Sequence, residues 1–234
     1  MFAMESIQKM LFCEQDIKYL DFNQKLVSNK KLIGVRMPII RQLAKKLVGE
    51  EPELVAEFLR ELPHQYLEEN HLHAFILMEE TNLQHLLVQT EKFLSYLDNW
   101  QTCDSFLPPL FKTDQSQVPQ KIIEWSQSQD EYTCRYALRL KLARQEFSSS
   151  DIAKVIKVGQ SEKYYVYMMA AWYLSMAAIK NPTEFSTLFT VEKMGERLYQ
   201  ATLRKICDSK QFSQAEKLMY KKGGECNGSE YSSQ

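Results

Sequence analysis

Glycine, the residue that most tight turns require, is scarce in this chain and is concentrated at its end. Three of the seven glycines, at positions 223, 224 and 228, fall within the last twelve residues. The only Asn-Gly pair, Asn227-Gly228, also lies there, and no alternating apolar run is flanked by the two-residue turns that mark β-hairpins. The sequence therefore predicts a fold without a β-sheet.

Apolar residues recur at helical spacing along nearly the whole chain, as in Leu43 and Leu47. Pro38, Pro52 and Pro182 fit the first turn of a helix, where the missing N–H costs nothing. The predicted helices cover residues 4–20, 22–31, 38–48, 52–61, 64–79, 83–97, 99–111, 115–128, 131–145, 150–159, 162–180, 182–189, 192–208 and 212–221.

Helices of this length, joined by short polar links and without heptads, predict an all-α, HEAT-like helical-repeat solenoid in which paired helices stack into a curved array. A compact helical bundle is the competing architecture. A chain with 44% hydrophobic residues can bury a sizeable core. We expect one domain over residues 1–222 and a disordered polar tail over residues 223–234, where little can be buried.

Several classes of protein are disfavoured by the sequence. The longest uncharged run, residues 164–179, is shorter than the roughly 18 to 20 residues of a membrane span and predicts a buried helix. The N-terminus does not resemble a signal peptide, and the five cysteines form neither a close pair nor a CxxC. His71 and His73 point apart on a helix, which disfavours a metal site with His64. We expect a cytoplasmic protein without membrane, metal or cofactor.

The formal net charge of -1 hides strong segregation of charge along the chain. Residues 22–49 carry seven basic residues and no acid, whereas residues 50–80 carry nine glutamates against the single base Arg60. A second acid-free stretch contains Arg135, Arg139, Lys141 and Arg144. Patches of one sign attract polyanions locally, although solvated helix faces explain the same pattern.

Trp100 and Asp104 are four residues apart and would project from one face of a helix. Asp98 and Gln101 have the spacing of a capping box, which would begin this helix. A carboxylate beside an aromatic ring can stabilise a developing cation and orient water. The alternative is a core tryptophan beside a surface aspartate.

Two further groups of residues are candidates for a binding site. Arg135 and Arg139 share a helix face and could grip successive phosphates, unless they are solvated or paired with a neighbouring helix. Trp172 lies on one stripe with Met168 and Met176, and such stripes are more often core than ligand platforms.

The order and spacing of these residues resemble the AlkD-type DNA alkylation repair family, HEAT-like-repeat enzymes that excise alkylated purines. The resemblance covers roughly residues 15–210. Its landmarks are Leu32-Ile-Gly-Val-Arg36-Met-Pro38 with Arg41, Asp98-Asn-Trp100 with Asp104-Ser105, Arg135, Tyr165-Val, Ala171-Trp172 and Asn181-Pro182.

The resemblance implies that Trp100, Asp104, Arg135 and Trp172 line a concave, basic DNA-binding face and are the catalytic residues. It further implies hydrolysis of the N-glycosidic bond of cationic N3- or N7-alkylated purines in double-stranded DNA, without flipping the base into a pocket. Asp104 would stabilise the oxocarbenium-like sugar and deliver water, in line with glycoside hydrolysis. The two indoles would flank the cationic nucleotide, and Arg135 would hold the phosphate.

The remaining DNA contacts are expected from basic residues, and the chain is expected to act as a monomer. The expected contacts are Lys25, Arg36, Arg41, Lys45, Arg135 and Arg139. Lys25 stands where the family carries an aromatic residue, so a stacking surface is exchanged for a phosphate contact. The alternatives are a catalytically inactive HEAT-like module that binds DNA or a protein, and a protein scaffold that binds no nucleic acid.

Overall fold

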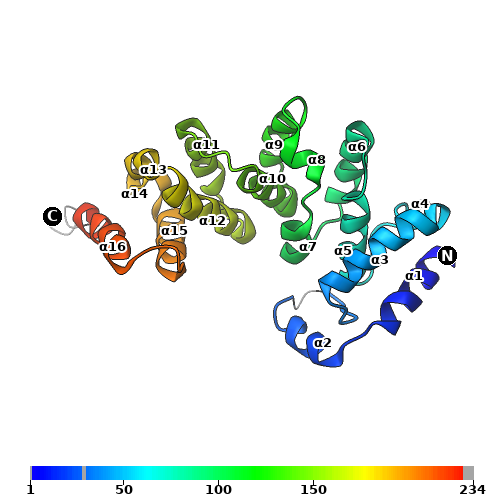
Figure 1. Ribbon diagram of the computed structural model, residues 1–234. Coiled ribbons are helices and arrows are strands. Elements are labelled where there is room, and N and C mark those ends of the chain that lie inside the picture. Colours follow the sequence, from blue (N-terminus) through cyan, green and yellow to red (C-terminus); the bar gives the residue numbers. More distant parts are fainter. Residues whose placement is uncertain (1, 28–29, 229–234) are drawn as a thin grey trace. The chain divides into compact units, whose positions relative to one another are not determined.

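The computed structural model describes residues 2–27 and 30–228 (Figure 1). Its regular elements in this part of the chain are helices, and the one extended pairing there is an isolated bridge between Lys31 and Tyr66. The prediction of an all-α fold is confirmed. Within the described residues, no helix is both long enough and apolar enough to cross a membrane.

The chain forms two compact units, residues 1–114 and 115–234, and each is described by itself. The curved solenoid and the single domain therefore remain predictions. The helices of the first unit are α1 (Phe2–Cys13), α2 (Ile17–Gln24), α3 (Met37–Glu50), α4 (Pro52–Phe58), α5 (Leu67–Leu77), α6 (Leu83–Leu94), α7 (Trp100–Ser105) and α8 (Pro109–Thr113).

The second unit packs around α12 (Tyr164–Lys180), the helix predicted from the long uncharged run. α12 contacts α10, α11, α13 and α15, and Met169, Tyr173 and Leu174 are fully buried among them. The other helices are α9 (Val118–Ser126), α10 (Glu131–Ala143), α11 (Ser149–Gly159), α13 (Pro182–Leu188), α14 (Val191–Met194), α15 (Glu196–Asp208) and α16 (Gln214–Gly228).

The N-terminal helices differ from the prediction in two places. The helix predicted over 4–20 is divided, because Asp16 caps a new helix: its Oδ1 accepts a hydrogen bond from the Tyr19 amide at 3.0 Å. The helix predicted over 22–31 is wrong, since α2 ends at Gln24 and the next helix in the described residues, α3, begins at Met37.

A buried carboxylate explains why residues 33–35 do not continue a helix. Glu68 of α5 accepts hydrogen bonds from the amides of Ile33 at 2.8 Å, Gly34 at 2.7 Å and Val35 at 3.3 Å. Gly34 has φ +95°, and a Cβ at this position would lie 2.7 Å from the Leu20 Cβ. Both the left-handed backbone and the close approach require glycine here.

The neighbouring glutamate is also buried and also binds backbone. Glu69 accepts hydrogen bonds from the Gln65 and Tyr66 amides, each at 2.8 Å, and from Gln8 Nε2 of α1 at 2.9 Å. Two of the nine glutamates in residues 50–80 therefore contribute to the interior of the unit and not to an acidic surface.

The three histidines near α5 are buried among aromatic rings. His64 Nε2 and His73 Nδ1 are 2.9 Å apart, and His71 stacks on Phe75. Burial lowers the pKa of His64 and of His71 to about 3 and also lowers the pKa of His73. In the part of the chain that the structure describes, no three potential metal ligands form a group.

Three other predicted elements end or divide differently. The helix predicted over 99–111 is two helices, α7 and α8, because Pro108 and Pro109 interrupt it. The helix predicted over 192–208 divides at Gly195, which has φ +72°. α16 continues through Gly228 into the predicted tail, and residues 229–234 lie outside the described residues.

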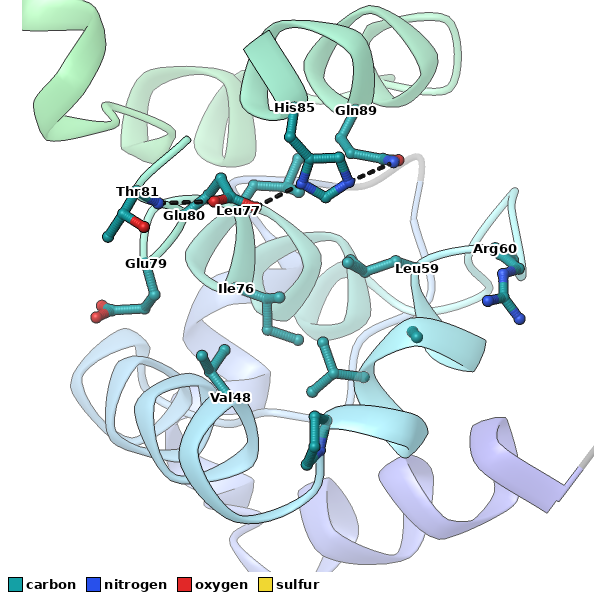
Figure 2. A pocket seen from close by; sticks show the side chains of 13 residues that line it. Val48, Leu59, Arg60, Ile76, Leu77, Glu79, Glu80, Thr81, His85 and Gln89 are labelled. Atoms are coloured by element: carbon teal, nitrogen blue, oxygen red, sulfur yellow. Dashed lines mark hydrogen bonds and ion pairs between the residues drawn. The ribbon is translucent and has the colours of Figure 1, made fainter. Parts of the chain in front are cut away.

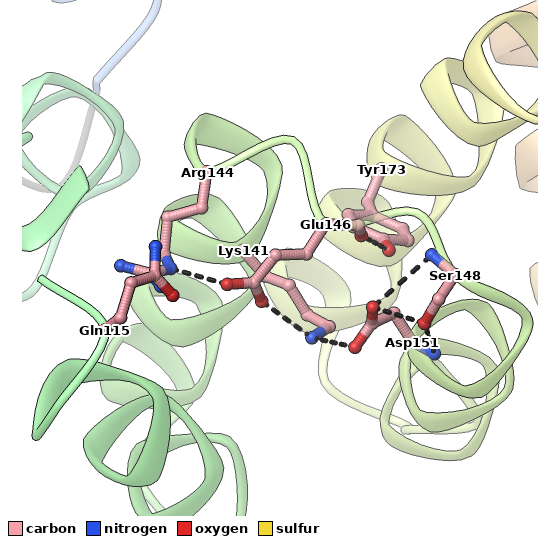
Figure 3. Close-up of polar contacts among 7 residues, drawn as sticks. All are labelled: Gln115, Lys141, Arg144, Glu146, Ser148, Asp151 and Tyr173. Carbon is pink, nitrogen blue, oxygen red and sulfur yellow. Dashed lines mark hydrogen bonds and ion pairs between the residues drawn. The ribbon is translucent and has the colours of Figure 1, made fainter. Parts of the chain in front are cut away.

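An ion-pair network joins the end of α10 to the start of α11 (Figure 3). Lys141 Nζ lies 3.0 Å from Glu146 Oε2 and 2.6 Å from Asp151 Oδ1, and Arg144 Nε lies 2.6 Å from Glu146 Oε1. The Tyr173 hydroxyl of α12 donates to the Glu146 carbonyl. Lys141 and Arg144 of the second basic stretch are therefore neutralised by nearby carboxylates.

We expect Glu68→Ala to lower the free energy of unfolding by about 3 kcal/mol or more, because it leaves up to three backbone amides without their acceptor. Chemical denaturation measures this loss. Glu57→Ala, at an exposed position of α4, is the matched control and should change stability by less than about 0.5 kcal/mol. Equal losses in the two variants would contradict the role of Glu68.

The buried histidines make stability depend on pH. Unfolded His71 takes up a proton near the ordinary histidine pKa of 6.5, whereas folded His71 does so only near about 3. The free energy of unfolding is therefore highest above pH 6.5 and falls as the pH is lowered below this value. His71→Leu should reduce the slope of unfolding free energy against pH by about 1.4 kcal/mol per pH unit between about pH 6 and 4. The exposed His85→Leu is the control, and an unchanged slope in the His71 variant would refute the prediction.

Candidate nucleic-acid interface

The helix that carries Trp100 and Asp104 begins at a different cap from the predicted one. Asn99 is the N-cap of α7, and its Oδ1 accepts a hydrogen bond from the Thr102 amide at 2.8 Å. Asp98 stands one residue too early and pairs with Lys30 at 2.5 Å, while Gln101 Nε2 donates to Asn23 Oδ1 at 2.7 Å. The predicted capping box is therefore wrong, but the helix start is within one residue of the prediction.

Trp100 and Asp104 share α7, and both are partly exposed. The Trp100 indole packs against the cluster formed by Val27, Leu32 and Leu67, and its Nε1 lies 3.4 Å from the Leu26 carbonyl oxygen. The indole is thus fixed on one side and accessible on the other. Lys25, the residue before Leu26, is the exposed C-cap of α2.

Arg36 links α2 to the start of α3. Its Nε and Nη2 donate to Asp16 Oδ2 at 3.0 and 2.9 Å, and its Cζ lies 4.9 Å from the centre of the Tyr19 ring. Hydrogen bonds from the Tyr19 amide and from Arg36 lower the pKa of the Asp16 carboxyl. The guanidinium is half exposed, so it presents charge to solvent while it holds the two helices together.

Arg41 and Lys45 lie one helical turn apart on α3 and line a pocket of about 310 Å³ together with Phe75 and Pro109. The Arg41 guanidinium carbon lies 3.9 Å from the centre of the Phe75 ring. Burial lowers the pKa of Arg41. Lys45 is exposed and is the more accessible of these two predicted phosphate contacts.

A second pocket, of about 550 Å³, has apolar residues of α3, α4 and α5 at its base, including Val48 and Ile76 (Figure 2). Its rim carries Glu79 and Glu80, and Glu80 Oε2 lies 2.5 Å from His85 Nδ1. Carboxylates repel phosphate, so this pocket is a poor surface for DNA. The six residues predicted to contact DNA are not among those that line it.

In the second unit, α10 side chains hold both backbone groups of Tyr165 near the start of α12. Glu131 Oε1 accepts a hydrogen bond from the Tyr165 amide at 2.7 Å, and Arg135 Nη1 donates to the Tyr165 carbonyl oxygen at 2.9 Å. Arg135 is only 7% exposed. Its guanidinium therefore has an anchoring role within the protein, whatever else it contacts.

One helical turn further along α10, Arg139 reaches Trp172 of α12. The Arg139 Cζ lies 5.3 Å from the centre of the indole, and Trp172 is 36% exposed. The indole of Trp172 is therefore on the surface of its unit and not in the core. Tyr165, seven residues earlier, lies on the same face of α12.

Glu131 and Tyr132 are residues of this site that the sequence did not reveal, and Tyr165 was named only as a landmark of the resemblance. The rings of Tyr132 and Tyr165 are 5.2 Å apart, beside the Arg135 anchor. The four-residue spacing of Glu131 and Arg135 was the available signal, because it places both side chains on one helix face. Trp100 and Asp104 belong to one unit and Arg135 and Trp172 to the other, so their meeting in one site remains a prediction.

The comparison with known proteins agrees with the resemblance. A model of the DNA alkylation repair enzyme family matches residues 9–191, and the chain therefore belongs to this family. No curated protein and no solved structure matches the chain. The protein is accordingly an enzyme of DNA repair, with DNA as its substrate.

We expect Arg135→Lys to lower the free energy of unfolding of the DNA-free protein by about 1 to 2 kcal/mol, because a lysine cannot reproduce the guanidinium geometry at the Tyr165 carbonyl. Thermal or chemical unfolding without DNA measures the effect. Arg204→Lys, at an exposed position of α15, should leave stability within about 0.5 kcal/mol of the wild type. A loss confined to DNA affinity would show that Arg135 is not an anchor.

Proposed function

We propose that this protein is a monofunctional DNA glycosylase that hydrolyses the N-glycosidic bond of cationic N3- or N7-alkylated purines in double-stranded DNA. The observation that carries the proposal is the exposed Trp172 indole with a positively charged group over its face. An aromatic face that already accommodates a guanidinium has the electrostatics that a cationic base requires. Membership of the repair family supplies the context.

The chemistry follows from the charge of the damaged base. Alkylation at a ring nitrogen makes the purine cationic, so the glycosidic C–N bond breaks with its electron pair moving to a neutral leaving base. Asp104, partly exposed on α7, is the carboxylate that we assign to stabilising the oxocarbenium-like sugar and orienting the attacking water. This hydrolysis requires no metal and no cofactor.

Trp100 and Trp172 are assigned to the cationic nucleotide, each contributing about 0.5 to 2 kcal/mol if it resembles other cation–aromatic contacts. Trp100 suits this role because one side of its indole is fixed by Val27 and Leu32 while part of the ring is accessible. Rings held in place lose little conformational freedom when a ligand stacks on them.

For the phosphates, we assign Lys25 and Lys45 as the most accessible contacts, because both are exposed. Arg36, Arg41 and Arg139 contact Asp16, Phe75 and Trp172, respectively, so any phosphate contact they make adds to or replaces an internal one. Arg135 is assigned mainly to holding α12. The HEAT-like arrangement of the helices is part of this proposal.

The contacts that these arginines make within the protein account for them without any reaction. This favours the second candidate function, a HEAT-like module that binds DNA or a protein without catalysis. Such a module would bind duplex DNA in a salt-dependent manner and release no base. The two candidates therefore differ in one measurable product, the free base, which only the glycosylase releases.

We expect Asp104→Asn to lower the rate of alkylpurine release from methylated duplex DNA by about 10²-fold or more, because a neutral amide cannot balance the developing positive charge. Chromatography of released bases under single-turnover conditions measures the rate. Asp208→Asn, at an exposed position at the end of α15, is the matched control and should act like the wild type. Absence of release by the wild-type protein, at any enzyme concentration, would refute the glycosylase and leave the alternatives without catalysis.

A further inference from the structure

Part of the first unit is opposite in charge to the basic residues assigned to DNA. Within residues 48–82, Arg60 is the only lysine or arginine, whereas seven glutamates are not buried. These seven are Glu50, Glu51, Glu53, Glu57, Glu61, Glu79 and Glu80. A concentration of one sign of charge repels polyanions and attracts cations. This stretch of the chain is therefore suited to a basic ligand and not to DNA.

The pocket of about 550 Å³ lies within this acidic stretch and has an aliphatic base (Figure 2). The base is formed by Val48 of α3, Val55 and Leu59 of and beside α4, and Ile76 and Leu77 of α5. Val48 is 37% exposed, whereas Ile76 closes the base at 4% exposure. Pockets of roughly 300 to 1,000 Å³ hold ligands in proteins, so this one has room for large side chains of another molecule.

The charged residues that line the pocket are unevenly distributed around it. Figure 2 shows Glu79 and Glu80 toward one end and Arg60 at the opposite end. Glu80 is held by two backbone amides, each at 2.8 Å, and by His85 Nδ1 at 2.5 Å, whereas the Glu79 side chain is exposed. The acidic end is also the C-terminus of α5, where the helix dipole favours cations. Charge and dipole therefore act together to stabilise a cation beside Glu79.

We propose that this pocket docks a segment of a partner protein, which inserts large aliphatic side chains between α3, α4 and α5 and places a lysine or arginine beside Glu79. An apolar centre with a polar rim is the usual anatomy of a protein interface. The acidic surroundings disfavour DNA and anionic lipids, because both present phosphates. The inference goes beyond the proposed function and does not depend on it, since none of the residues assigned to DNA lines the pocket. Glu79 also lines the neighbouring pocket of Arg41 and Lys45, so it marks the boundary between the two surfaces.

The test titrates the full chain, labelled on its isoleucine, leucine and valine methyl groups, with three capped tetrapeptides and follows the NMR signals. The peptides are Lys-Leu-Leu-Lys, Glu-Leu-Leu-Glu and Lys-Ser-Ser-Lys. Lys-Leu-Leu-Lys should shift the methyl signals of Val48, Val55 and Ile76 in a saturable manner. Glu-Leu-Leu-Glu should bind roughly fivefold more weakly or less, because its charges are repelled, and Lys-Ser-Ser-Lys should shift none of these signals. Added salt should weaken the basic leucine peptide and reduce its preference over the acidic one.

Two substitutions separate the contribution of charge from that of the cavity. Glu79→Gln should weaken binding of Lys-Leu-Leu-Lys roughly two- to fivefold, the value of one exposed ion pair. Glu14→Gln, at an exposed position just after α1 and outside the pocket lining, is the matched control and should change neither affinity. Ala56→Trp fills the pocket from α4 and should abolish binding of both leucine peptides. If Ala56→Trp does not fold, the comparison of Glu79→Gln with Glu14→Gln decides.

Saturable shifts in this pocket, a preference for the basic leucine peptide and a weaker preference in Glu79→Gln support the proposal. Equal affinity for the two leucine peptides, no shifts at the pocket methyl groups, an unchanged affinity in Glu79→Gln, or displacement of Lys-Leu-Leu-Lys by undamaged duplex DNA overturns it. Sedimentation of the protein alone tests another occupant. A wild-type dimer that Ala56→Trp converts to a monomer would assign the pocket to a second copy of this chain and would also overturn the proposal.

Discussion

The buried carboxylate of Glu68 is the contact on which the first unit depends. It accepts hydrogen bonds from the consecutive amides of residues 33–35. The extended segment that it holds places Leu32 under the Trp100 indole and Arg36 at the start of α3. A buried charge is tolerated because several oriented dipoles replace its hydration. The candidate catalytic helix α7 therefore rests on a loop whose conformation α5 imposes.

In the second unit, a glutamate and an arginine of one helix bind the backbone of the neighbouring helix. Glu131 and Arg135 bind the amide and the carbonyl of Tyr165, which sets the register between α10 and α12. That register brings Arg139 beside Trp172 one turn later. The residue that the family resemblance assigns to the phosphate is thus also the one that positions the aromatic face.

The charge pattern shows where charged residues lie along the sequence, but it does not show which of their side chains are accessible to a ligand. Basic residues at 141 and 144 are neutralised by Glu146 and Asp151, whereas two glutamates that suggested an acidic surface are interior acceptors for backbone amides. Sequence shows the sign of a side chain but not its partner, because the partners lie 33 to 35 residues away for Glu68. The charge pattern therefore overstates how many basic side chains are available to bind phosphate.

The sequence by itself determined the all-α class, most helix positions and the family, because helical periodicity, proline at helix starts and motif spacing are local properties. Tertiary structure decided the rest. It held residues 33–35 in a non-helical conformation through Glu68, and it made Asn99 the N-cap of the helix that begins at Trp100, since Asp98 pairs with Lys30. It also exposed Trp172 under Arg139 while burying Arg135. These outcomes depend on contacts between residues distant in sequence, and local propensity carries no information about such contacts.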